Sequence, residues 1–373
     1  MPTSTCVDVL VVGAGLAGLS TATGLARRGH DVLLVDRRTS LSAAVRTTGI
    51  FVRRTLDDFP LPEAHLGPPI RRVVLYPPGM RRSVPLTSGR DEYRVGDMAA
   101  LYESAAREAT AAGVQVATGT RYRGRDADGV AYLERSGVPD AVRARFVVGA
   151  DGARSRVARD LGLDRNTALL IGAEEVYAVA AHDEEPSFHC LLDPRLAPGY
   201  LAWVVDDGQH AHVGIAGYPD RFRTGFRPTL DRFAATAPAR VGVRRAGQVE
   251  RRGGPIPVGG LLRRIAGPDG LLVGDAAGAV SPLTAGGLDP CLRQAGLAVD
   301  VLDDALRTGR RDALQRYDGA SLRTRFRGRL ALRRVLAGVR DHRTVTAAFA
   351  VLGTPVGRYA ARRVLFGDRS FPG

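Results

Sequence analysis

The chain has 373 residues, of which 45% are hydrophobic, and this is enough to bury the cores of two interleaved domains. Its formal net charge is +14, and all 53 of its basic residues are arginine. Sixteen of these arginines lie in residues 301–373, against six acidic residues. Because the arginines are not interleaved with aromatic side chains, the charge does not indicate a nucleic-acid-binding protein.

The cysteines and histidines predict no metal site. Cys6, Cys190 and Cys291 form no CxxC pair and are odd in number, which argues against a disulfide framework and against zinc. His210 and His212 share one face of a predicted strand, but no third ligand accompanies them. We therefore expect a solvated strand face at these histidines and no bound metal.

Hydropathy bears on the compartment. No uninterrupted apolar run reaches the roughly 20 residues that a membrane span needs. No basic region precedes the first apolar stretch, so the sequence does not predict a signal peptide. We expect a cytoplasmic protein that lies, at most, against a membrane surface.

The first 36 residues have the order of a dinucleotide-binding unit. Residues 7–12 are apolar and β-branched and predict a buried parallel strand, and residues 16–28 predict the helix that follows. Between them lies a loop that permits a tight turn, a close approach to pyrophosphate and close helix packing, through Gly13, Gly15 and Gly18. A second strand, 31–35, ends at Asp36, which is placed to hydrogen-bond ribose hydroxyls.

Two later motifs also follow predicted strands. Residues 145–148 lead into Gly149-Ala150-Asp151-Gly152, and residues 271–273 lead into Gly274-Asp275. An apolar helix is predicted at 288–306. Three such returns indicate one long cofactor that carries phosphate, and we identify it as FAD.

With these motifs the chain resembles the flavoprotein superfamily of the para-hydroxybenzoate hydroxylase fold and, within it, the geranylgeranyl reductase family. The resemblance implies that Asp151-Gly152 contacts both FAD and NAD(P)H and that Asp275 holds the ribityl chain of FAD. It also implies that arginines of the loop after the second strand and of the segment before helix 97–111 face the cofactor. The predicted FAD-binding residues are Gly13, Gly15, Gly18, Asp36, Arg46, Arg94, Asp151, Gly152, Gly274, Asp275 and Gly286.

The stretch 281–288 is similar to the segment that lies beside the flavin ring in the reductase family. By this resemblance Pro282 walls the ring. The backbone N–H groups of Gly287 and Leu288, at a helix N-terminus, then stabilise the negative charge that develops on the flavin. The Arg-rich tail at 323–340 also resembles that of the reductases.

Three departures from the reductase pattern leave the reaction open. Ala285-Gly286-Gly287 stands where the family carries Gly-Glu-Gly, and Arg46-Thr47-Thr48-Gly49 lacks a cysteine found in many members. The substrate signature of the family is only echoed by residues 199–205. The alternatives are NAD(P)H-driven reduction of C=C bonds in an isoprenoid or lipid, hydroxylation of an aromatic or polyketide substrate, and a non-catalytic or electron-transfer flavoprotein.

The predicted fold is α/β, with a discontinuous Rossmann-type FAD-binding domain, an antiparallel substrate domain and a helical tail. The FAD-binding domain would comprise residues 1–75, 94–165 and 260–306, the substrate domain 76–93 and 166–259, and the Arg-rich C-terminal region 307–373. Further predicted elements are a helix at 97–111, strands at 114–117, 173–182, 200–205 and 210–216, and turns at 77–79 and 253–255.

The substrate is expected to be small and apolar, and no obligate protein partner is inferred. Tyr200 and Trp203 either line the substrate pocket or simply pack in the sheet. In the tail, Leu322, Phe326 and Leu330 recur at helical spacing. This basic amphipathic helix either packs on its own domain or lies on an anionic membrane and admits a lipid.

Overall fold

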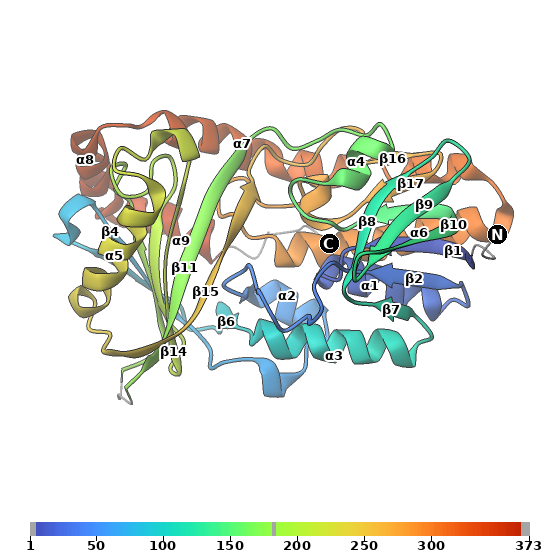
Figure 1. Cartoon of the computed structure of the whole chain (residues 1–373). Coiled ribbons are helices and arrows are strands. Elements are labelled where there is room, and N and C mark those ends of the chain that lie inside the picture. The colour runs from blue at the N-terminus through green and yellow to red at the C-terminus, as the bar shows by residue number, and fades with distance from the viewer. Residues whose placement is uncertain (1–4, 181–183, 367–373) are drawn as a thin grey trace. The chain divides into compact units, whose positions relative to one another are not determined.

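The computed structural model of the chain describes residues 5–180 and 184–366, which form two compact units (Figure 1). Unit 1 comprises the N-terminal segment up to Val45 with residues 99–169 and 256–330. Unit 2 comprises residues 46–98 and 170–255 with the C-terminal segment from Ala331. The predicted bounds differ from those of the two units. Residues 46–75 and 94–98 belong to unit 2, residues 166–169 and 256–259 belong to unit 1, and the predicted C-terminal region is shared between the units.

A sheet with the strand order β16-β17-β10-β1-β2-β7 forms the centre of unit 1, and β17 to β7 along this path are parallel (Figure 1). A hairpin of β8 and β9 continues from the first half of β10 in antiparallel pairing. The strands are β1 Thr5–Val12, β2 Val32–Val35, β7 Gln115–Ala117, β8 Thr120–Arg125, β9 Val130–Arg135, β10 Val138–Gly149, β16 Ala266–Gly267 and β17 Gly270–Leu272.

The register brings the predicted motifs to one edge of this sheet. Val12, the last residue of β1, lies opposite both Val35 and Gly149, and Gly149 lies opposite Leu272. Parallel strands that end in the same row place their following loops side by side. The three glycine motifs and Asp36 therefore start from one edge of the sheet, which is where ligands bind in such folds.

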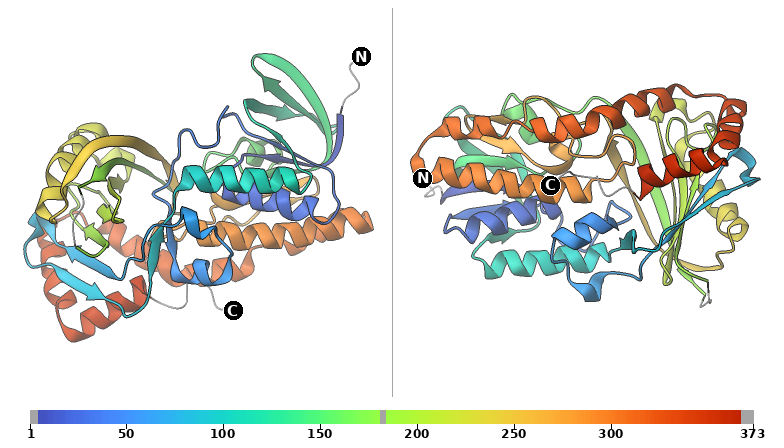
Figure 2. Two further views of the ribbon diagram at one scale, coloured as in Figure 1. Left: turned by 90° about the horizontal axis from the view of Figure 1, so that it is seen from below. Right: turned by 180° about the vertical axis from the view of Figure 1, so that it is seen from behind.

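The helices of unit 1 are α1 Leu16–Ala26, α3 Met98–Ala111, α4 Arg156–Asp160 and α6 Leu288–Thr308, with the first part of α7 Ala320–Gly338. Figure 2 shows α6 alongside α1. A Cβ on Gly24 would lie 2.7 Å from Val299 Cγ2, so the two helices pack at a distance that only glycine allows. The predicted helices 16–28, 97–111 and 288–306 are thus confirmed to within two residues at each end.

Unit 2 is built on a seven-stranded sheet with the order β15-β11-β14-β13-β12-β4-β5. The run from β11 to β12 is antiparallel as predicted, whereas β12 and β4 are parallel. The strands are β4 Arg72–Tyr76, β5 Val84–Thr87, β11 Leu169–Val179, β12 Ser187–Leu191, β13 Ala202–Asp206, β14 His210–Gly217 and β15 Arg245–Pro257. A separate pair joins β3 Ile50–Val52 to β6 Tyr93–Val95, and the helices are α2 Arg53–Asp58, α5 Phe226–Arg240, α8 His342–Leu352 and α9 Pro355–Leu365.

Helix α5 covers one face of this sheet, and the core of unit 2 lies between them (Figure 1). Leu230 and Phe233 of α5 pack against alternate residues of the strands, among them Val204 and Val213, which are fully buried. The period of two along each strand accounts for this arrangement. Residues 202 to 206 are nevertheless all buried, so the opposite face of the sheet is also covered.

Two of the predicted elements need correction. The turn predicted at 253–255 is wrong, because these residues continue β15, and a Cβ on Gly253 would lie 2.9 Å from the carbonyl oxygen of Gly172 in β11. The glycines there permit close strand approach rather than a turn. The strand predicted to reach His182 ends at Val179, and residues 181–183 lie outside the described part of the chain.

The helical stripe of the tail is divided in α7. Leu322 and Phe326 are buried, in accord with packing on their own unit, whereas Val335 is 65% exposed. Within residues 5–180 and 184–366, none of the helices combines the length and the hydropathy that crossing a membrane requires.

Candidate functional site

The first glycine loop is shaped by positions where a side chain cannot exist. Gly13 has a φ of +107°, and a Cβ on it would overlap the carbonyl oxygen of Ala150. A Cβ on Gly18 would overlap the carbonyl oxygen of Gly13. Gly15 is different, since no atom lies within 4 Å of the position that its Cβ would take. Gly13 and Gly18 therefore hold the loop together, and Gly15 faces open space.

That open space adjoins the N-terminus of α1. The helix begins at Leu16, and its N-cap residue, Gly15, provides no side-chain hydrogen bond to the first turn. The first N–H groups of a helix without a capping side chain carry a partial positive charge and bind anions. The loop thus has the backbone geometry and the room that a pyrophosphate group needs.

The second and third motifs meet this loop. Ala150 lies against both Gly13 and Gly18. A Cβ on Gly274 would lie 3.0 Å from the Cβ of Ala17 in α1 and 3.5 Å from that of Cys291 in α6. The three motifs that we singled out in the sequence are therefore in contact, and the first turns of α1 and α6 flank the third.

Asp36, at the end of β2, is bound to the glycine loop. Its Oδ2 accepts a hydrogen bond from the backbone N–H of Ala14 at 2.8 Å, and its Oδ1 accepts from Arg38 Nε at 3.0 Å. Burial alone would raise the pKa of Asp36, but the hydrogen bonds from Arg38 and from Ala14 bring it below its ordinary value. Asp36 is therefore a charged acceptor beside the loop, and Arg38 holds it in place.

Asp275 has the opposite character. Its carboxylate is half-buried, and no residue in the described part of the chain donates a hydrogen bond to it or forms an ion pair with it. Burial raises the pKa of Asp275 to about 6. Its Oδ1 would lie 3.4 Å from a Cβ on Gly287 at the start of α6. An unpartnered acceptor at this place fits the hydroxyl groups of the ribityl chain of FAD.

Asp151 has a role within the fold. Its carboxylate accepts hydrogen bonds from Ser155 Oγ at 2.6 Å and from the backbone N–H groups of Arg156 and Val157. These bonds fix the first turn of α4. The following Gly152 has a φ of +86°, which favours glycine. Contact of Asp151 and Gly152 with a cofactor remains a prediction.

The segment 281–288 forms a tight loop before α6. Ser281 donates its N–H to the carbonyl of Gly286 at 3.0 Å, and Ala285 donates its own to the carbonyl of Ser281 at 2.9 Å. Ala285 has a φ of +52°, so the chain keeps a left-handed conformation where the reductases carry glycine. Pro282 is buried, and the N-cap Gly287 gives α6 no side-chain cap. The N–H groups at Gly287 and Leu288 thus belong to an uncapped helix N-terminus, and their role at the flavin ring remains a prediction.

The two predicted arginines, Arg46 and Arg94, belong to unit 2 rather than to the glycine loops. Arg94 donates from Nε to the carbonyl of Gly67 at 2.6 Å and from Nη2 to that of Leu66, and its Nη1 pairs with Glu63. Its guanidinium group therefore fastens the segment 63–67. Arg46 is exposed, and a role at the cofactor remains a prediction for both residues.

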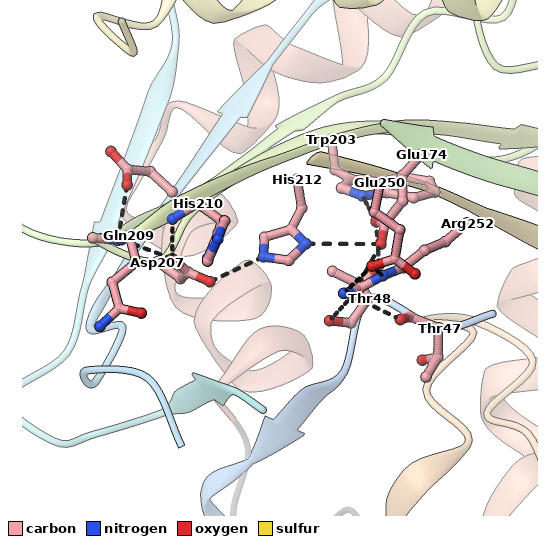
Figure 3. A network of polar contacts seen from close by, with 12 residues as sticks. Thr47, Thr48, Glu174, Trp203, Asp207, Gln209, His210, His212, Glu250 and Arg252 are labelled. Atoms are coloured by element: carbon pink, nitrogen blue, oxygen red, sulfur yellow. Dashed lines mark hydrogen bonds and ion pairs between the residues drawn. The ribbon is translucent and has the colours of Figure 1, made fainter. Parts of the chain in front are cut away.

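Trp203 is part of a polar network on the sheet face opposite α5 (Figure 3). Its indole N–H donates to Glu174 Oε2 at 3.0 Å, and Thr48 Oγ1 donates to the same oxygen at 2.6 Å. The indole lies across Gly214, where any Cβ would overlap the ring. Trp203 is only 9% exposed, which favours sheet packing over a substrate wall. Tyr200 is half-buried and retains both interpretations.

His212 extends this network. Its Nε2 lies 2.9 Å from Asp207 Oδ2, and its Nδ1 lies 3.8 Å from Glu174 Oε1 (Figure 3). Burial would lower the pKa of His212, but the two carboxylates raise it to about 9. The prediction of a solvated strand face was wrong for His212, which is 3% exposed. No group of three metal-binding side chains exists among the described residues.

Sequence reasoning missed side chains that support the third motif. Asn166, the only asparagine of the chain, donates to the carbonyl oxygens of Asp275 at 2.8 Å and Ala153 at 3.1 Å. Gln294, on the buried face of α6, accepts from the N–H of Gly274 at 2.8 Å. A lone asparagine and a glutamine among apolar helix positions were the available signals.

Comparison with known proteins agrees with this geometry. A family model described as FAD binding domain matches residues 100–326, and one described as FAD dependent oxidoreductase matches residues 8–63. Digeranylgeranylglycerophospholipid reductase 1 of Methanothermobacter thermautotrophicus is 30% identical over 322 residues, covering 81% of this chain and 78% of that protein. Its counterpart from Methanopyrus kandleri is 31% identical over 319 residues, covering 80% and 81%.

Two solved structures share the fold. A geranylgeranyl bacteriochlorophyll reductase-like protein from Thermoplasma acidophilum has a TM-score of 0.83 at 20% identity, with 98% of each chain covered. A p-nitrophenol 4-monooxygenase from Pseudomonas putida has a TM-score of 0.70 at 19% identity, covering 98% of this chain and 99% of that one. With the converging glycine motifs and the unpartnered Asp275, these matches show that the chain belongs to the FAD-binding oxidoreductases.

Proposed function

We propose that this protein uses NAD(P)H and FAD to reduce C=C bonds of an isoprenoid lipid. The observation that carries the proposal is the similarity, at 30–31% identity over four fifths of the chain, to two proteins named as digeranylgeranylglycerophospholipid reductases. The similarity covers more of the chain than either unit comprises, so it extends over both units. An apolar small-molecule substrate follows from the same relatives.

The residues of unit 1 would hold FAD in an extended form. The N-terminus of α1, with Gly13, Gly15 and Gly18, would receive the pyrophosphate, and Asp36 the adenosine ribose. The carboxylate of Asp275, with Gly274 beside it, would accept hydrogen bonds from the ribityl hydroxyls. Bound FAD supplies the means to take hydride from NAD(P)H and to pass it on.

At the ring end, the N–H groups of Gly287 and Leu288 would stabilise negative charge, because they lie at the uncapped N-terminus of α6. The loop of Pro282 and Gly286 would shield the ring from water. Asp151 and Gly152, and Arg46 and Arg94 of unit 2, complete the set of cofactor residues that we propose.

The C-terminal helices support contact with an anionic membrane. Residues 320–366 hold eleven arginines and one acidic residue. Large apolar side chains are exposed on the same helices, namely Leu332, Val335, Leu336, Val351, Val356, Tyr359 and Val364. Basic and apolar groups on one set of helices suit a surface that binds acidic lipid headgroups and reaches the acyl region.

A flavin monooxygenase is the second candidate. The observations that favour it are Gly286 where the reductases carry glutamate, the absence of cysteine in residues 46–49, the incomplete substrate signature at 199–205, and the fold shared with p-nitrophenol 4-monooxygenase. The two reactions differ in what consumes the reduced cofactor.

The test is performed on the purified holoprotein without oxygen. The flavin absorbance is bleached with NADH or NADPH, and a digeranylgeranyl glycerophospholipid is then added. Reoxidation of the flavin, with a mass gain of two hydrogens per reduced double bond, supports the proposal. If the lipid does not reoxidise the flavin, and admitting oxygen then inserts an oxygen atom into an aromatic substrate, the protein is instead a monooxygenase.

Membrane contact is tested by co-sedimentation with vesicles. Wild-type protein should bind vesicles of acidic phospholipid and not those of phosphatidylcholine. Replacing Val335 and Val356 together by serine should weaken binding, because both side chains are more than half exposed. Val249→Ser, at a position of similar exposure in β15, is the matched control and should bind as wild type does.

A further inference from the structure

Arg333 of α7 is unusual among the arginines of this chain. In the part of the chain that the structure describes, it is the only arginine that is fully buried, with 3% of its surface exposed. Two of its nitrogens, Nε and Nη2, are inaccessible and make no hydrogen bond. A buried guanidinium is ordinarily paired with a carboxylate or with carbonyl oxygens, because desolvating a single unpaired ion costs several kcal/mol.

The surroundings of Arg333 add positive charge and aromatic rings. Its guanidinium carbon lies 5.2 Å from the ring centre of Tyr200 and 5.4 Å from that of Tyr218. The guanidinium carbon of Arg221 also lies over Tyr218, at 4.3 Å from the same ring centre. Arg221 donates from Nη1 to the carbonyl of Ala337 at 2.8 Å. All four side chains belong to unit 2.

No acidic group balances these two charges. Among the described residues, neither Arg221 nor Arg333 forms an ion pair, and the hydroxyls of Tyr200 and Tyr218 make no hydrogen bond. Cation–π contacts offset part of the desolvation of a guanidinium, but they leave its N–H donors unused. The cluster therefore has two cations, two hydroxyl groups that make no hydrogen bond, and at least two N–H groups without an acceptor.

We propose that Arg333, with Arg221, Tyr200 and Tyr218, forms a binding site for a phosphate group. A guanidinium fork binds phosphate oxygens in pairs, and a charge of +2 matches a phosphomonoester or diphosphate. Tyr200 and Tyr218 are half-buried and border the surface, whereas Nε and Nη2 of Arg333 are inaccessible, so a phosphate group would reach these two donors only after a tyrosine ring moves aside. On the proposed function, this phosphate is that of the lipid substrate, which would be anchored here by its headgroup.

The sequence indicates Tyr200 as a candidate for lining the substrate pocket. In this site its hydroxyl would donate a hydrogen bond to the phosphate group. Burial raises the pKa of Tyr200, with Arg333 opposing, so its hydroxyl stays protonated and remains a donor. Trp203, three residues later, is committed to Glu174. The two aromatic residues of the segment thus have different tasks, one at a ligand and one within the sheet.

The experiment measures binding to the FAD-loaded protein by titration calorimetry and by thermal unfolding. The probes are inorganic phosphate, glycerol phosphate and dihexanoyl phosphatidic acid, with dihexanoyl glycerol as the uncharged control. Bound FAD occupies the pyrophosphate loop, so a second phosphate must bind elsewhere. Binding of glycerol phosphate as tight as that of phosphatidic acid would indicate a free phosphate ligand, and tighter binding of phosphatidic acid a lipid headgroup.

Three variants separate ligand binding from folding. R333M keeps the length of the side chain and removes the charge, and we expect the affinity for phosphatidic acid to fall at least about tenfold. R333K should retain part of the affinity, because it keeps the charge and loses the fork. R240M, at the exposed last residue of α5 and outside the C-terminal helices, is the control and should bind as wild type does.

The stability of the variants without phosphate is the second readout. Since replacing an unpaired buried charge by an apolar side chain is neutral or stabilising, R333M should unfold at the wild-type temperature or above it. A lower unfolding temperature of R333M together with unchanged phosphate affinity would overturn the proposal and give Arg333 a structural role.

The phosphate site and the proposed reductase function can fail independently, because phosphate binding is measured without turnover. Arg333-dependent binding of phosphatidic acid in a protein that reduces no prenyl lipid would keep the phosphate site and reject the reductase. Reduction of prenyl alcohols and phospholipids with equal KM, unaffected by R333M, would reject the phosphate site and keep the reductase.

Discussion

The cofactor edge of unit 1 and the polar face of the unit 2 sheet are built in opposite ways. At the cofactor edge the shape comes from missing side chains, as at Gly13 and Gly18, and the donors are backbone N–H groups. On the face of unit 2, Glu174 and His212 are charged side chains that are 2% and 3% exposed. An added methyl group disrupts a site that is shaped by closely packed backbone. Removal of one charged partner disrupts a site that is made of buried charges. The two units should therefore fail in different ways.

The largest effect is expected at Gly18. In Gly18→Ala the new methyl group would overlap the carbonyl of Gly13, so the loop or α1 has to move. We expect destabilisation by more than about 3 kcal/mol, above the usual range for overpacking, and a protein without FAD. Gly15→Ala is the control, since its methyl group meets no atom.

Gly15→Ala should fold as wild type does and bind FAD more weakly, because the methyl group occupies the space beside the helix N-terminus. Unfolding temperature and the ratio of flavin to protein absorbance measure the two effects. Equal loss of stability in both variants would show that the open space at Gly15 is not a ligand site.

Unit 2 should respond to pH through His212. Its pKa is raised to about 9, above the ordinary 6.5, so the imidazolium contributes fully below pH 6.5 and its contribution is lost as the pH rises through 9. The groups that face it are Glu174 and Asp207, with Arg252 Nη1 at 3.7 Å from Glu174. The pKa values of both carboxylates are lowered, so their contribution is lost on acidification instead.

The free energy of unfolding of wild type should thus fall by about 3 kcal/mol between pH 6.5 and 9. His212→Gln should be less stable at pH 6.5 and should lose most of this slope. Denaturant titrations followed by circular dichroism test this, and an unchanged slope in the variant would assign the pH dependence to other groups.

Asp275 gives a smaller effect, and its charged form opposes folding whereas the charged form of His212 favours it. Its pKa of about 6 exceeds the ordinary 3.8, so ionisation opposes folding of the apoprotein increasingly from pH 4 to pH 6. Asp275→Asn should stabilise the apoprotein at pH 8 by about 1–2 kcal/mol, a figure reduced for partial solvent access. The same variant should bind FAD more weakly, because the amide is the poorer acceptor for ribityl hydroxyls.

Thermal unfolding of apoprotein and FAD titration measure the two changes at Asp275. A variant that lost apoprotein stability would contradict an unpartnered carboxylate, and one with wild-type FAD affinity would remove Asp275 from the cofactor site.

The smallest effect is expected at Ala285. Its left-handed φ of +52° strains a non-glycine residue by about 1 kcal/mol. Ala285→Gly relieves this strain but increases the entropy of the unfolded chain, so we expect stabilisation by at most about 1 kcal/mol. The unfolding temperature measures it, and a clear loss of stability would show that the methyl group makes a packing contact that outweighs the strain.

The same contrast explains what the sequence could predict. The strand at 7–12 and the glycine motifs were predictable, because local spacing determines them and the register of parallel strands then brings them together. Glu174 and His212 were not, since they are 38 residues apart and alternate with apolar residues, as solvent-facing side chains do. Their burial depends on the pairing of β11 with β14 and on Thr48 from another segment.

The position of Trp203 has a practical consequence. It is the only tryptophan of the chain, its indole lies flat on Gly214, and its N–H is held by Glu174. Indole fluorescence depends on the polarity and charge around the ring, so the emission of the apoprotein reports on this single location. The protein therefore carries its own optical label for the sheet of unit 2, and rapid-mixing experiments can follow that region without any chemical modification.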